Sequence, residues 1–273
     1  MSKSVAVIMC VYFKDDPHLL DLSVESVVNQ TYRDISLYIY LDGPLTNELN
    51  SVLNKYRFKK NIFIFASDIN NGLAYGLNFL IEKALLSNCS YIARMDADDF
   101  CLSNRIEAQV SFLESNHHVS VLGTAITEYD GIKNTFNKVL PLNHNDLIRN
   151  FIKQCPFNHP TVIFRRSVFE DGMRYPTDKL LSEDIYFWTE LAANGYIFAN
   201  LQSPLLKFYI TEDTIKRRRG IKKAYAELGV RFHIMSKLNL FSGMNLLYSI
   251  AHFLIRVGPY SLHKLAYKFR ARI

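Results

Sequence analysis

The first hundred residues alternate between short apolar runs and segments of helical spacing, and this alternation limits the possible fold more than any other feature. The runs occupy residues 5–11, 35–41, 62–65 and 91–95, and they are rich in Val, Ile and aromatic side chains, as buried strands are. Between them, leucine and valine recur three or four residues apart. Strands that alternate with helices predict parallel βαβ units, and therefore an α/β protein with a mostly parallel sheet flanked by helices.

Polar and acidic residues follow these predicted strands. Tyr12 follows the first, Asp42 the second and Asp68 the third, while Asp96 and Asp98 follow the fourth. Open parallel sheets bind ligands at the carboxyl ends of their strands. We therefore expect an acidic edge there, which suits a metal ion better than a bare phosphate.

Several enzyme classes are disfavoured by what the sequence lacks. No glycine precedes Gly43, whereas dinucleotide-binding and P-loop proteins need glycines directly after the first strand. No G-x-S-x-G sequence marks a serine hydrolase. The four cysteines form no C-x-x-C pair, so a zinc site is disfavoured and a reducing cytosol fits.

The sequence Asp96-Ala97-Asp98 is the candidate metal motif. Residues i and i+2 of an extended segment point to the same side, so both carboxylates can converge on one cation. Mg²⁺ and Mn²⁺ prefer such oxygen ligands together with substrate phosphates. The structural alternative is a solvated acidic turn before the helix expected from Leu102 onward.

Three further candidates lie in the second half of the chain. Asp184, in the pair Glu183-Asp184, precedes an apolar-periodic stretch and is either a general base or a helix-capping acid. His159 precedes a strand-like segment and is either structural or part of a site. Trp188 is the single tryptophan, and it either stacks on a sugar ring or packs in the core.

Charge is distributed unevenly along the chain. Residues 1–213 carry 19 Lys and Arg against 25 Asp and Glu, whereas residues 214–273 carry 13 basic residues and one acid, Glu227. The tail contains a basic cluster over residues 216–223 and an amphipathic pattern over residues 244–256. Basic amphipathic helices favour anionic membrane interfaces. Packing of these helices against the rest of the protein is the alternative, and both can hold.

Nine segments together resemble family 2 glycosyltransferases of the GT-A fold, in the order found in that family and over roughly residues 4–210. They resemble most closely the branch that builds bacterial O-antigen, lipopolysaccharide or capsule. The segments are VAVIMCVY (5–12), SVVNQTY (26–32), LYIYLDG (37–43), NGLAYGLN (71–78), YIARMDADD (91–99), NRIEAQ (104–109), HPTV (159–162), EDIYFW (183–188) and GYIFAN (195–200).

The resemblance implies a role for individual residues. On the donor side, Val11 and Tyr12 would flank the nucleobase, Asp42 would bind uracil, and Asn71 would lie nearby. Asp98 would ligate Mn²⁺ or Mg²⁺ directly, and Asp96 would contact the ribose and the metal's hydration shell. Asp184 would be the catalytic base, with His159, Glu183 and Trp188 beside the acceptor.

This chain departs from the family pattern in three places. Leu41 stands where the family often has a first acid before Asp42. Before Asn78 the family commonly has a small residue and an arginine, where this chain has Gly76 and Leu77, so a phosphate or base contact would come from elsewhere, with Lys14 as a candidate. No Q-x-x-R-W sequence follows Asp184, which favours transfer of a single sugar over processive synthesis.

The sequence therefore predicts two parts, a GT-A catalytic domain over residues 1–213 and a basic helical tail over residues 214–273. The expected activity is metal-dependent, inverting transfer from a UDP-sugar, a hexose or N-acetylhexosamine, to a glycan or lipid-linked glycan acceptor. We expect the protein in the cytoplasm, peripheral on the inner face of the membrane, with no nucleic acid partner. The alternative is a non-catalytic protein that binds nucleic acid or an anionic surface through its tail.

Overall fold

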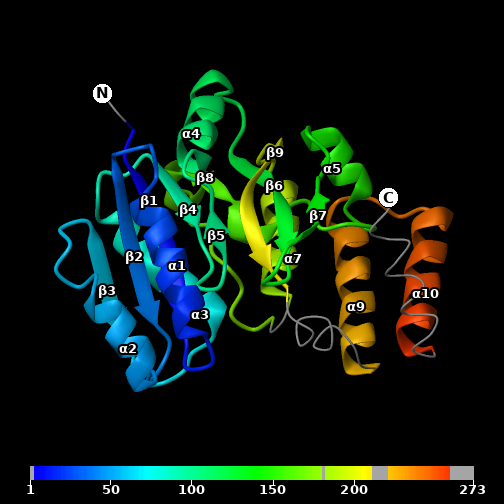
Figure 1. Ribbon diagram of the computed structural model, residues 1–273. Helices are drawn as coiled ribbons and strands as arrows, with labels where there is room; N and C mark the ends of the chain where they lie inside the picture. The colour runs from blue at the N-terminus through cyan, green and yellow to red at the C-terminus, as the bar shows by residue number, and fades with distance from the viewer. Residues whose placement is uncertain (1–2, 180–181, 211–220, 259–273) are drawn as a thin grey trace.

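A computed structural model describes residues 3–179, 182–210 and 221–258, with the side chains of residues 222 and 223 left aside (Figure 1). The first part of the chain runs β1 (Val5–Val11), α1 (Pro17–Val28), β2 (Ile35–Leu41), α2 (Asn47–Asn54), β3 (Ile62–Ala66), α3 (Leu73–Leu85) and β4 (Tyr91–Arg94). β1 pairs in parallel with β2 and β4, and β2 pairs in parallel with β3. The predicted parallel βαβ half is therefore confirmed.

The second part of the chain extends the sheet with mixed pairing. It comprises β5 (Phe100–Cys101), α4 (Arg105–Ser115), β6 (Val121–Tyr129), β7 (Asn134–Lys138), α5 (His144–Asn150), the 3-10 helix η1 (His159–Thr161), β8 (Ile163–Arg165), α6 (Arg166–Glu170), α7 (Glu183–Ala193) and β9 (Phe198–Tyr209). The sheet order is β3-β2-β1-β4-β8-β6-β9-β5, with β7 beside β6. β8 is antiparallel to both β4 and β6.

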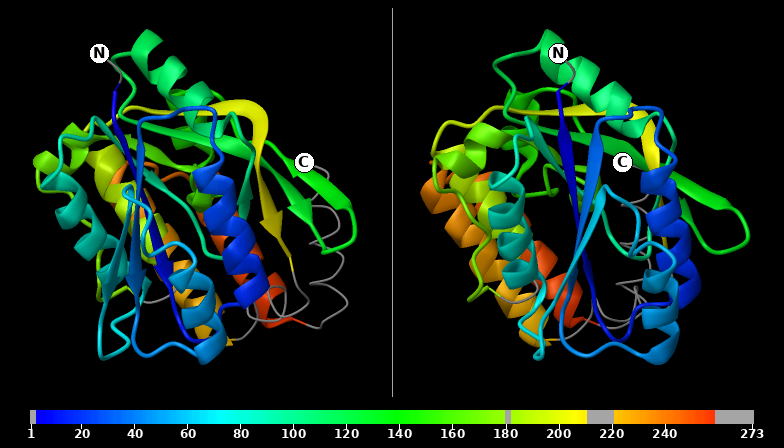
Figure 2. Two further views of the ribbon diagram at one scale, coloured as in Figure 1. Left: turned by 60° about the vertical axis from the view of Figure 1, so that its left-hand side comes forward. Right: turned by 90° about the vertical axis from the view of Figure 1, so that its left-hand side faces the viewer.

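Each face of the sheet carries its own hydrophobic core. Alternate residues of β1 belong to different cores: Val5, Val7 and Met9 pack toward α1, α2 and α4, while Ala6 and Ile8 pack toward α3 and α7. Figure 2 shows the sheet edge-on, between α1 on one side and α3 on the other. This double burial explains why β1 is a continuous apolar run in the sequence.

In the described part of the basic tail, residues 221–258, the chain forms two helices, α9 (Ile221–Lys237) and α10 (Gly243–Val257). α9 packs against α7, and α10 packs on α9 as the outermost element at that end of the molecule (Figure 1). α9 contributes three side chains to the hydrophobic core that α7 also joins: Val230, Ile234 and Met235. Residues 216–219 of the predicted basic cluster and the basic residues after Pro259 lie outside the described residues. Within the described ranges, no helix combines the length and the apolar character needed to cross a membrane.

Candidate active site

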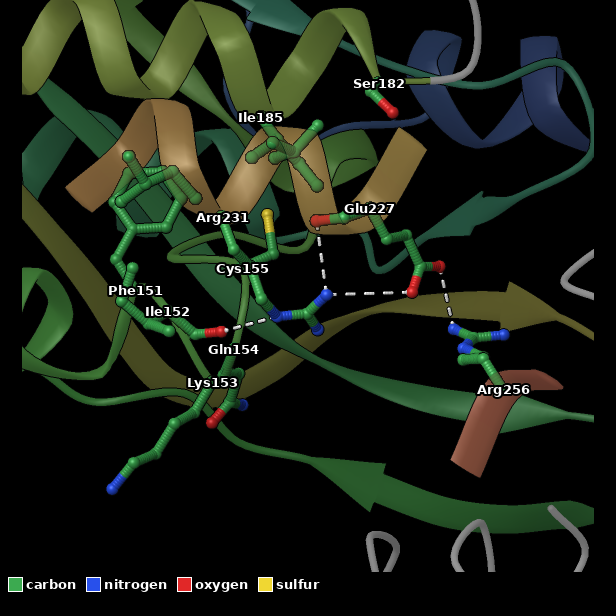
Figure 3. A pocket seen from close by; sticks show the side chains of 12 residues that line it. Phe151, Ile152, Lys153, Gln154, Cys155, Ser182, Ile185, Glu227, Arg231 and Arg256 are labelled. Atoms are coloured by element: carbon green, nitrogen blue, oxygen red, sulfur yellow. Dashed lines mark hydrogen bonds and ion pairs between the residues drawn. The ribbon is translucent and has the colours of Figure 1, made fainter. Parts of the chain in front are cut away.

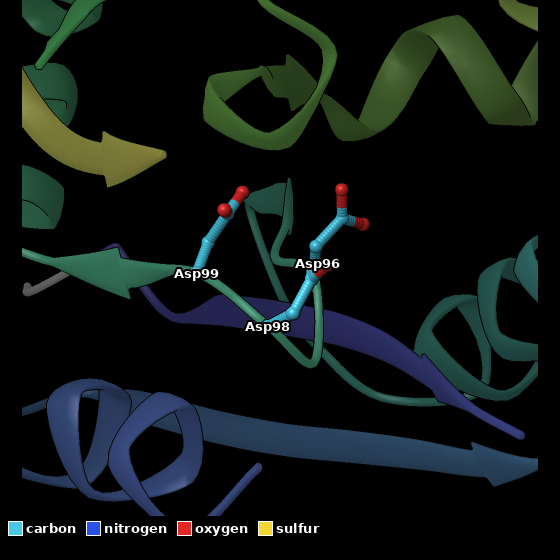
Figure 4. A group of neighbouring side chains, drawn as sticks. All are labelled: Asp96, Asp98 and Asp99. Atoms are coloured by element: carbon cyan, nitrogen blue, oxygen red, sulfur yellow. The ribbon is translucent and has the colours of Figure 1, made fainter. Parts of the chain in front are cut away.

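The acidic motif lies on the turn that leaves β4, at the carboxyl end of the parallel strands (Figure 4). Three hydrogen bonds hold this turn. The Met95 N–H donates to the Ile8 carbonyl at 3.0 Å, and the Ser23 hydroxyl donates to the Asp96 carbonyl at 2.6 Å. Arg105 donates from Nη2 to the Arg94 carbonyl at 2.7 Å. The position of the motif is therefore fixed by β1, α1 and α4 together.

Asp96, Asp98 and Asp99 form a compact cluster, because one carboxylate oxygen from each lies within 4.8 Å of the others. Asp98 is exposed, whereas Asp99 is buried and accepts a hydrogen bond from the Tyr209 N–H at 3.2 Å. Burial raises the pKa of Asp99 well above its ordinary value, and the charges of Asp96 and Asp98 raise it further. Asp99 Oδ2 has no hydrogen-bond partner within the described part of the chain. This crowding of hard oxygen ligands fits Mg²⁺ or Mn²⁺.

Arg94 provides a buried positive charge beside the cluster. Its Nη2 lies 2.5 Å from Asp96 Oδ1, and its side chain is only 4% exposed. Nε and Nη1 of Arg94 are also buried, and among the described residues they have no hydrogen-bond partner. Desolvation would lower the pKa of this guanidinium, but the surrounding acidic groups, led by Asp96 and Tyr175, raise it on balance. Arg94 therefore stays charged and orients Asp96.

On the predicted donor side, Asp42 connects the end of β2 to the start of α3. Its Oδ1 accepts from the Asn71 N–H at 2.7 Å and its Oδ2 accepts from the Gly72 N–H at 3.0 Å. The Asn71 side chain donates to the Tyr40 hydroxyl at 3.1 Å. Each carboxylate oxygen has a second lone pair, so this arrangement leaves Asp42 able to accept from a ligand.

The loop after β1 brings a further acid to the site. Asp15 accepts a hydrogen bond from the Tyr12 N–H at 2.9 Å. Burial raises the pKa of Asp15 to about 7, and the charges of Asp98 and Asp96 act in the same direction. Tyr12 is half-buried, whereas Val11 is fully buried and belongs to the strand core. Lys14 is exposed and lies over the Phe13 ring.

The proposed base, Asp184, lies in the first turn of α7 and is partly buried. Its Oδ1 accepts from the Ile185 N–H at 2.8 Å. Burial raises the pKa of Asp184 to about 6, the charge of the partly buried Glu183 adds to this, and the Arg94 guanidinium opposes it. Because Arg94 influences both Asp96 and Asp184, the two halves of the predicted site share one electrostatic environment.

His159 lies in η1 and Trp188 in α7, the helix that carries Asp184. His159 Nε2 is 3.0 Å from the Tyr175 hydroxyl, and burial lowers the pKa of His159 well below its usual value. Trp188 is fully buried and packs edge-on against His159, with ring centroids 5.5 Å apart. A direct contact of Trp188 with an acceptor would therefore need the overlying side chains to move.

The structure adds residues that sequence reasoning missed. Arg94 lies two residues before the predicted motif and Asp99 directly after it; both are buried, and the sequence alone does not show burial. Asp15 lies four residues beyond β1 in a loop whose course the sequence does not reveal. Tyr175 lies in the segment between α6 and α7, where no periodic pattern marks it.

The fold and the acidic edge define the class of protein. The structure is similar to S. aureus TarS residues 1–349 in complex with UDP-GlcNAc, with a TM-score of 0.67 and 16% identity over 93% of this chain and 72% of that one. It is also similar to the Pyrobaculum calidifontis mannosyltransferase PcManGT in complex with GDP-Man and Mn²⁺, with a TM-score of 0.62 and 15% identity, covering 98% and 79% of the two chains. In a longer TarS structure this chain spans 50% of the length. The fold is thus that of GT-A glycosyltransferases.

Residues 6–173 match the profile of Glycosyl transferase family 2, and the chain belongs to that family. It is 30% identical over 267 residues to an Escherichia coli UDP-Gal:alpha-D-GlcNAc-diphosphoundecaprenol beta-1,3-galactosyltransferase, covering 96% of this chain and 94% of that one. It is 32% identical over 217 residues to the Erwinia amylovora amylovoran biosynthesis glycosyltransferase AmsE, covering 79% of each chain. The protein is therefore a glycosyltransferase, and the alternative of a non-catalytic binding protein is set aside.

Proposed function

We propose that this glycosyltransferase moves a single sugar from a UDP-hexose or UDP-N-acetylhexosamine to a hydroxyl of a glycan or lipid-linked glycan, with inversion, during synthesis of a bacterial surface polysaccharide. The observation that carries this is the acidic cluster at the end of β4, which shares the buried Arg94 charge with Asp184. A uridine donor is supported by the E. coli relative, whose name includes UDP-Gal. That name also includes a lipid-linked acceptor.

In this proposal Asp98 and Asp96 hold Mn²⁺ or Mg²⁺, and Asp99 stands beside them. A bound divalent ion offsets the charge of a departing diphosphate. Arg94 holds Asp96 in place through the 2.5 Å ion pair. Asp42 and Tyr12 form the nucleoside end of the donor site, with Asn71 beside Asp42, while Val11, buried in the strand core, supports this end from within.

Asp184 acts as the base. It accepts the proton of the acceptor hydroxyl while the hydroxyl oxygen bonds to the anomeric carbon and the bond to the diphosphate breaks. With a pKa of about 6, Asp184 is ionised at neutral pH and is more basic than an ordinary aspartate. A positioned base of this kind contributes about 10²–10⁴-fold to the rate. Glu183 and His159 lie beside the acceptor in this proposal, and Trp188 supports His159 from behind.

A lipid-linked acceptor resides in a membrane, so we propose that the protein acts from the cytoplasm on the inner membrane surface. The experiment that tests the reaction is a panel of UDP-sugars with a soluble alkyl-diphosphate GlcNAc acceptor, with product analysed by mass spectrometry and NMR. We expect one donor to give a β-linked product, and we expect its formation to require Mn²⁺ or Mg²⁺. An α-linked product, or equal transfer in the presence of EDTA, would contradict the proposal.

A further inference from the structure

α10 turns its polar face toward the protein. Ser249 is fully buried, and His252 and Arg256 have side chains that are 14% and 13% exposed. His252 and Arg256 meet Glu227 of α9: Arg256 Nη2 lies 2.9 Å from Glu227 Oε1, and His252 Nδ1 lies 3.7 Å from Oε2. Figure 3 shows Glu227 between Arg231 and Arg256. An ionic cluster therefore holds the inward face of α10 in place.

The opposite face of α10 is apolar and open to solvent. We call it the outward stripe, and its side chains are 41–68% exposed: Met244 68%, Leu247 62%, Ile250 45%, Leu254 57% and Val257 41%. From Leu247 onward the spacing is three, four and three residues, which places these side chains along one line of the helix. A helix that only covers a protein core would turn this apolar stripe inward. The reversed orientation indicates that something apolar covers it.

The basic charge of residues 214–273 and the length of α10 indicate that lipid covers the outward stripe. Glu227, the single acid of residues 214–273, lies in the ionic cluster under α10, whereas this part of the sequence holds 13 Lys and Arg. The sequence after α10, residues 259–273, contributes four Lys and Arg and no acid. α10 has 15 residues, and a spanning helix needs about 20. An apolar stripe next to a basic sequence is typical of a helix that lies in the plane of an anionic membrane.

We propose that the outward stripe of α10 docks this protein on an anionic lipid bilayer. This deepens the proposed function, because it names the surface that meets the membrane of a lipid-linked acceptor. α10 packs on α9, α9 packs on α7, and α7 carries Asp184 in its first turn. The docking surface is thereby joined by packed helices to the proposed base.

The test is flotation of the full-length protein with vesicles of phosphatidylcholine alone and of phosphatidylcholine mixed with phosphatidylglycerol. We expect binding to the mixed vesicles and weaker binding to the neutral ones. The stripe variant, which should bind at least ~10-fold more weakly, combines Met244→Ser, Leu247→Ser, Ile250→Ser and Leu254→Ser. The control, which should bind like the wild type, changes three apolar residues of the catalytic part that are more exposed than the stripe, at 83–91%: Phe58→Ser, Leu86→Ser and Ile132→Ser.

Circular dichroism and thermal melting show whether the stripe variant is folded, and the double variant Leu247→Ser, Leu254→Ser replaces it if it is not. Absence of wild-type binding to mixed vesicles, or equal binding by a folded stripe variant, would overturn the proposal. A third result would also overturn it: the wild type is a dimer that does not bind vesicles, and the stripe variant is a monomer. A second copy of the chain would then cover the stripe. Vesicle binding needs no sugar nucleotide, so failure here leaves the proposed transfer standing, and failure of transfer leaves docking standing.

Discussion

Arg94 illustrates how one buried charge can serve two parts of a site. It pairs with Asp96 and, through its field, opposes the rise in the pKa of Asp184 that burial causes. Two of its nitrogens are buried without a hydrogen-bond partner in the described chain, which is costly for a charged group. Such a cost is expected at functional sites more than in ordinary cores.

The pH dependence of activity follows from Asp184. A base must be ionised, so kcat/KM should rise with pH through about 6, the raised pKa of Asp184, and level off above it. Arg94→Met removes the charge that lowers this pKa, so the rise should move to higher pH. Because Asp96 loses its partner, activity at the plateau should also fall by about 10²-fold.

Arg165→Met is the matched control for Arg94→Met. Arg165 pairs in register with Tyr91 at the other end of β4 and bonds backbone carbonyls there. That variant should leave the pH profile in place. An unshifted profile in Arg94→Met would show that Arg94 does not influence the base.

The sequence predicted much of the site because its acids follow strands, and strand ends meet at one edge. To place Asp96, Asp98 and Asp42 at this edge, it was enough to predict the strand that precedes each of them. Arg94 and Asp15 could not be assigned, since their roles depend on burial and on a loop conformation. The sequence also left open whether Trp188 stacks on a sugar ring or packs in the core. Its full burial places it in the core, where it packs edge-on against His159.

At the scale of elements, Gly76 determines how closely α3 approaches the sheet. A Cβ on Gly76 would lie 2.7 Å from Tyr40 Cδ1 and 2.8 Å from Cys10 Sγ. This explains the glycine at a position where the family pattern has a small residue. Close packing of α3 on β1 and β2 keeps the Asp42 contacts with Asn71 and Gly72 in place.

Gly76→Ala should therefore destabilise the protein, although alanine favours helices by ~1 kcal/mol over glycine. The crowding at Tyr40 and Cys10 costs about 1–3 kcal/mol. Gly229→Ala, in α9, meets nothing within 4 Å and should instead raise the melting temperature by about 2–4 °C. Thermal melting followed by circular dichroism compares the two. Stabilisation by both substitutions would refute the packing argument.

The parallel half of the sheet was predictable because its strands are buried on both faces and therefore continuous in their apolar character. The antiparallel β8 has three residues and follows a 3-10 helix, so its pairing with β4 and β6 depends on long-range contacts. The sequence predicted the amphipathic character of the segment that forms α10. Which face of α10 turns inward depends on Glu227 of α9, a tertiary contact.

For the whole molecule, α9 belongs to the same core as α7, so we expect the catalytic part and the tail to unfold together. Met235 is fully buried, and Met235→Ala should lower the free energy of unfolding by about 2–5 kcal/mol. Phe232→Ala, on the same helix but 40% exposed, should cost much less. Urea denaturation followed by fluorescence and circular dichroism measures both. Unchanged stability in Met235→Ala, or two separate transitions, would show that the tail is independent.

Calorimetric titration of UDP with Mn²⁺ tests the central claim, that Asp98 belongs to a metal-dependent donor site and Asp184 to the base. The wild type and Asp184→Asn should bind UDP alike with Mn²⁺, and Asp184→Asn should lose about 10²–10⁴-fold in transfer rate. Asp98→Ala should bind UDP at least ~10-fold more weakly, as should the wild type in EDTA. Equal UDP binding by Asp98→Ala and wild type, unaffected by EDTA, would contradict the account.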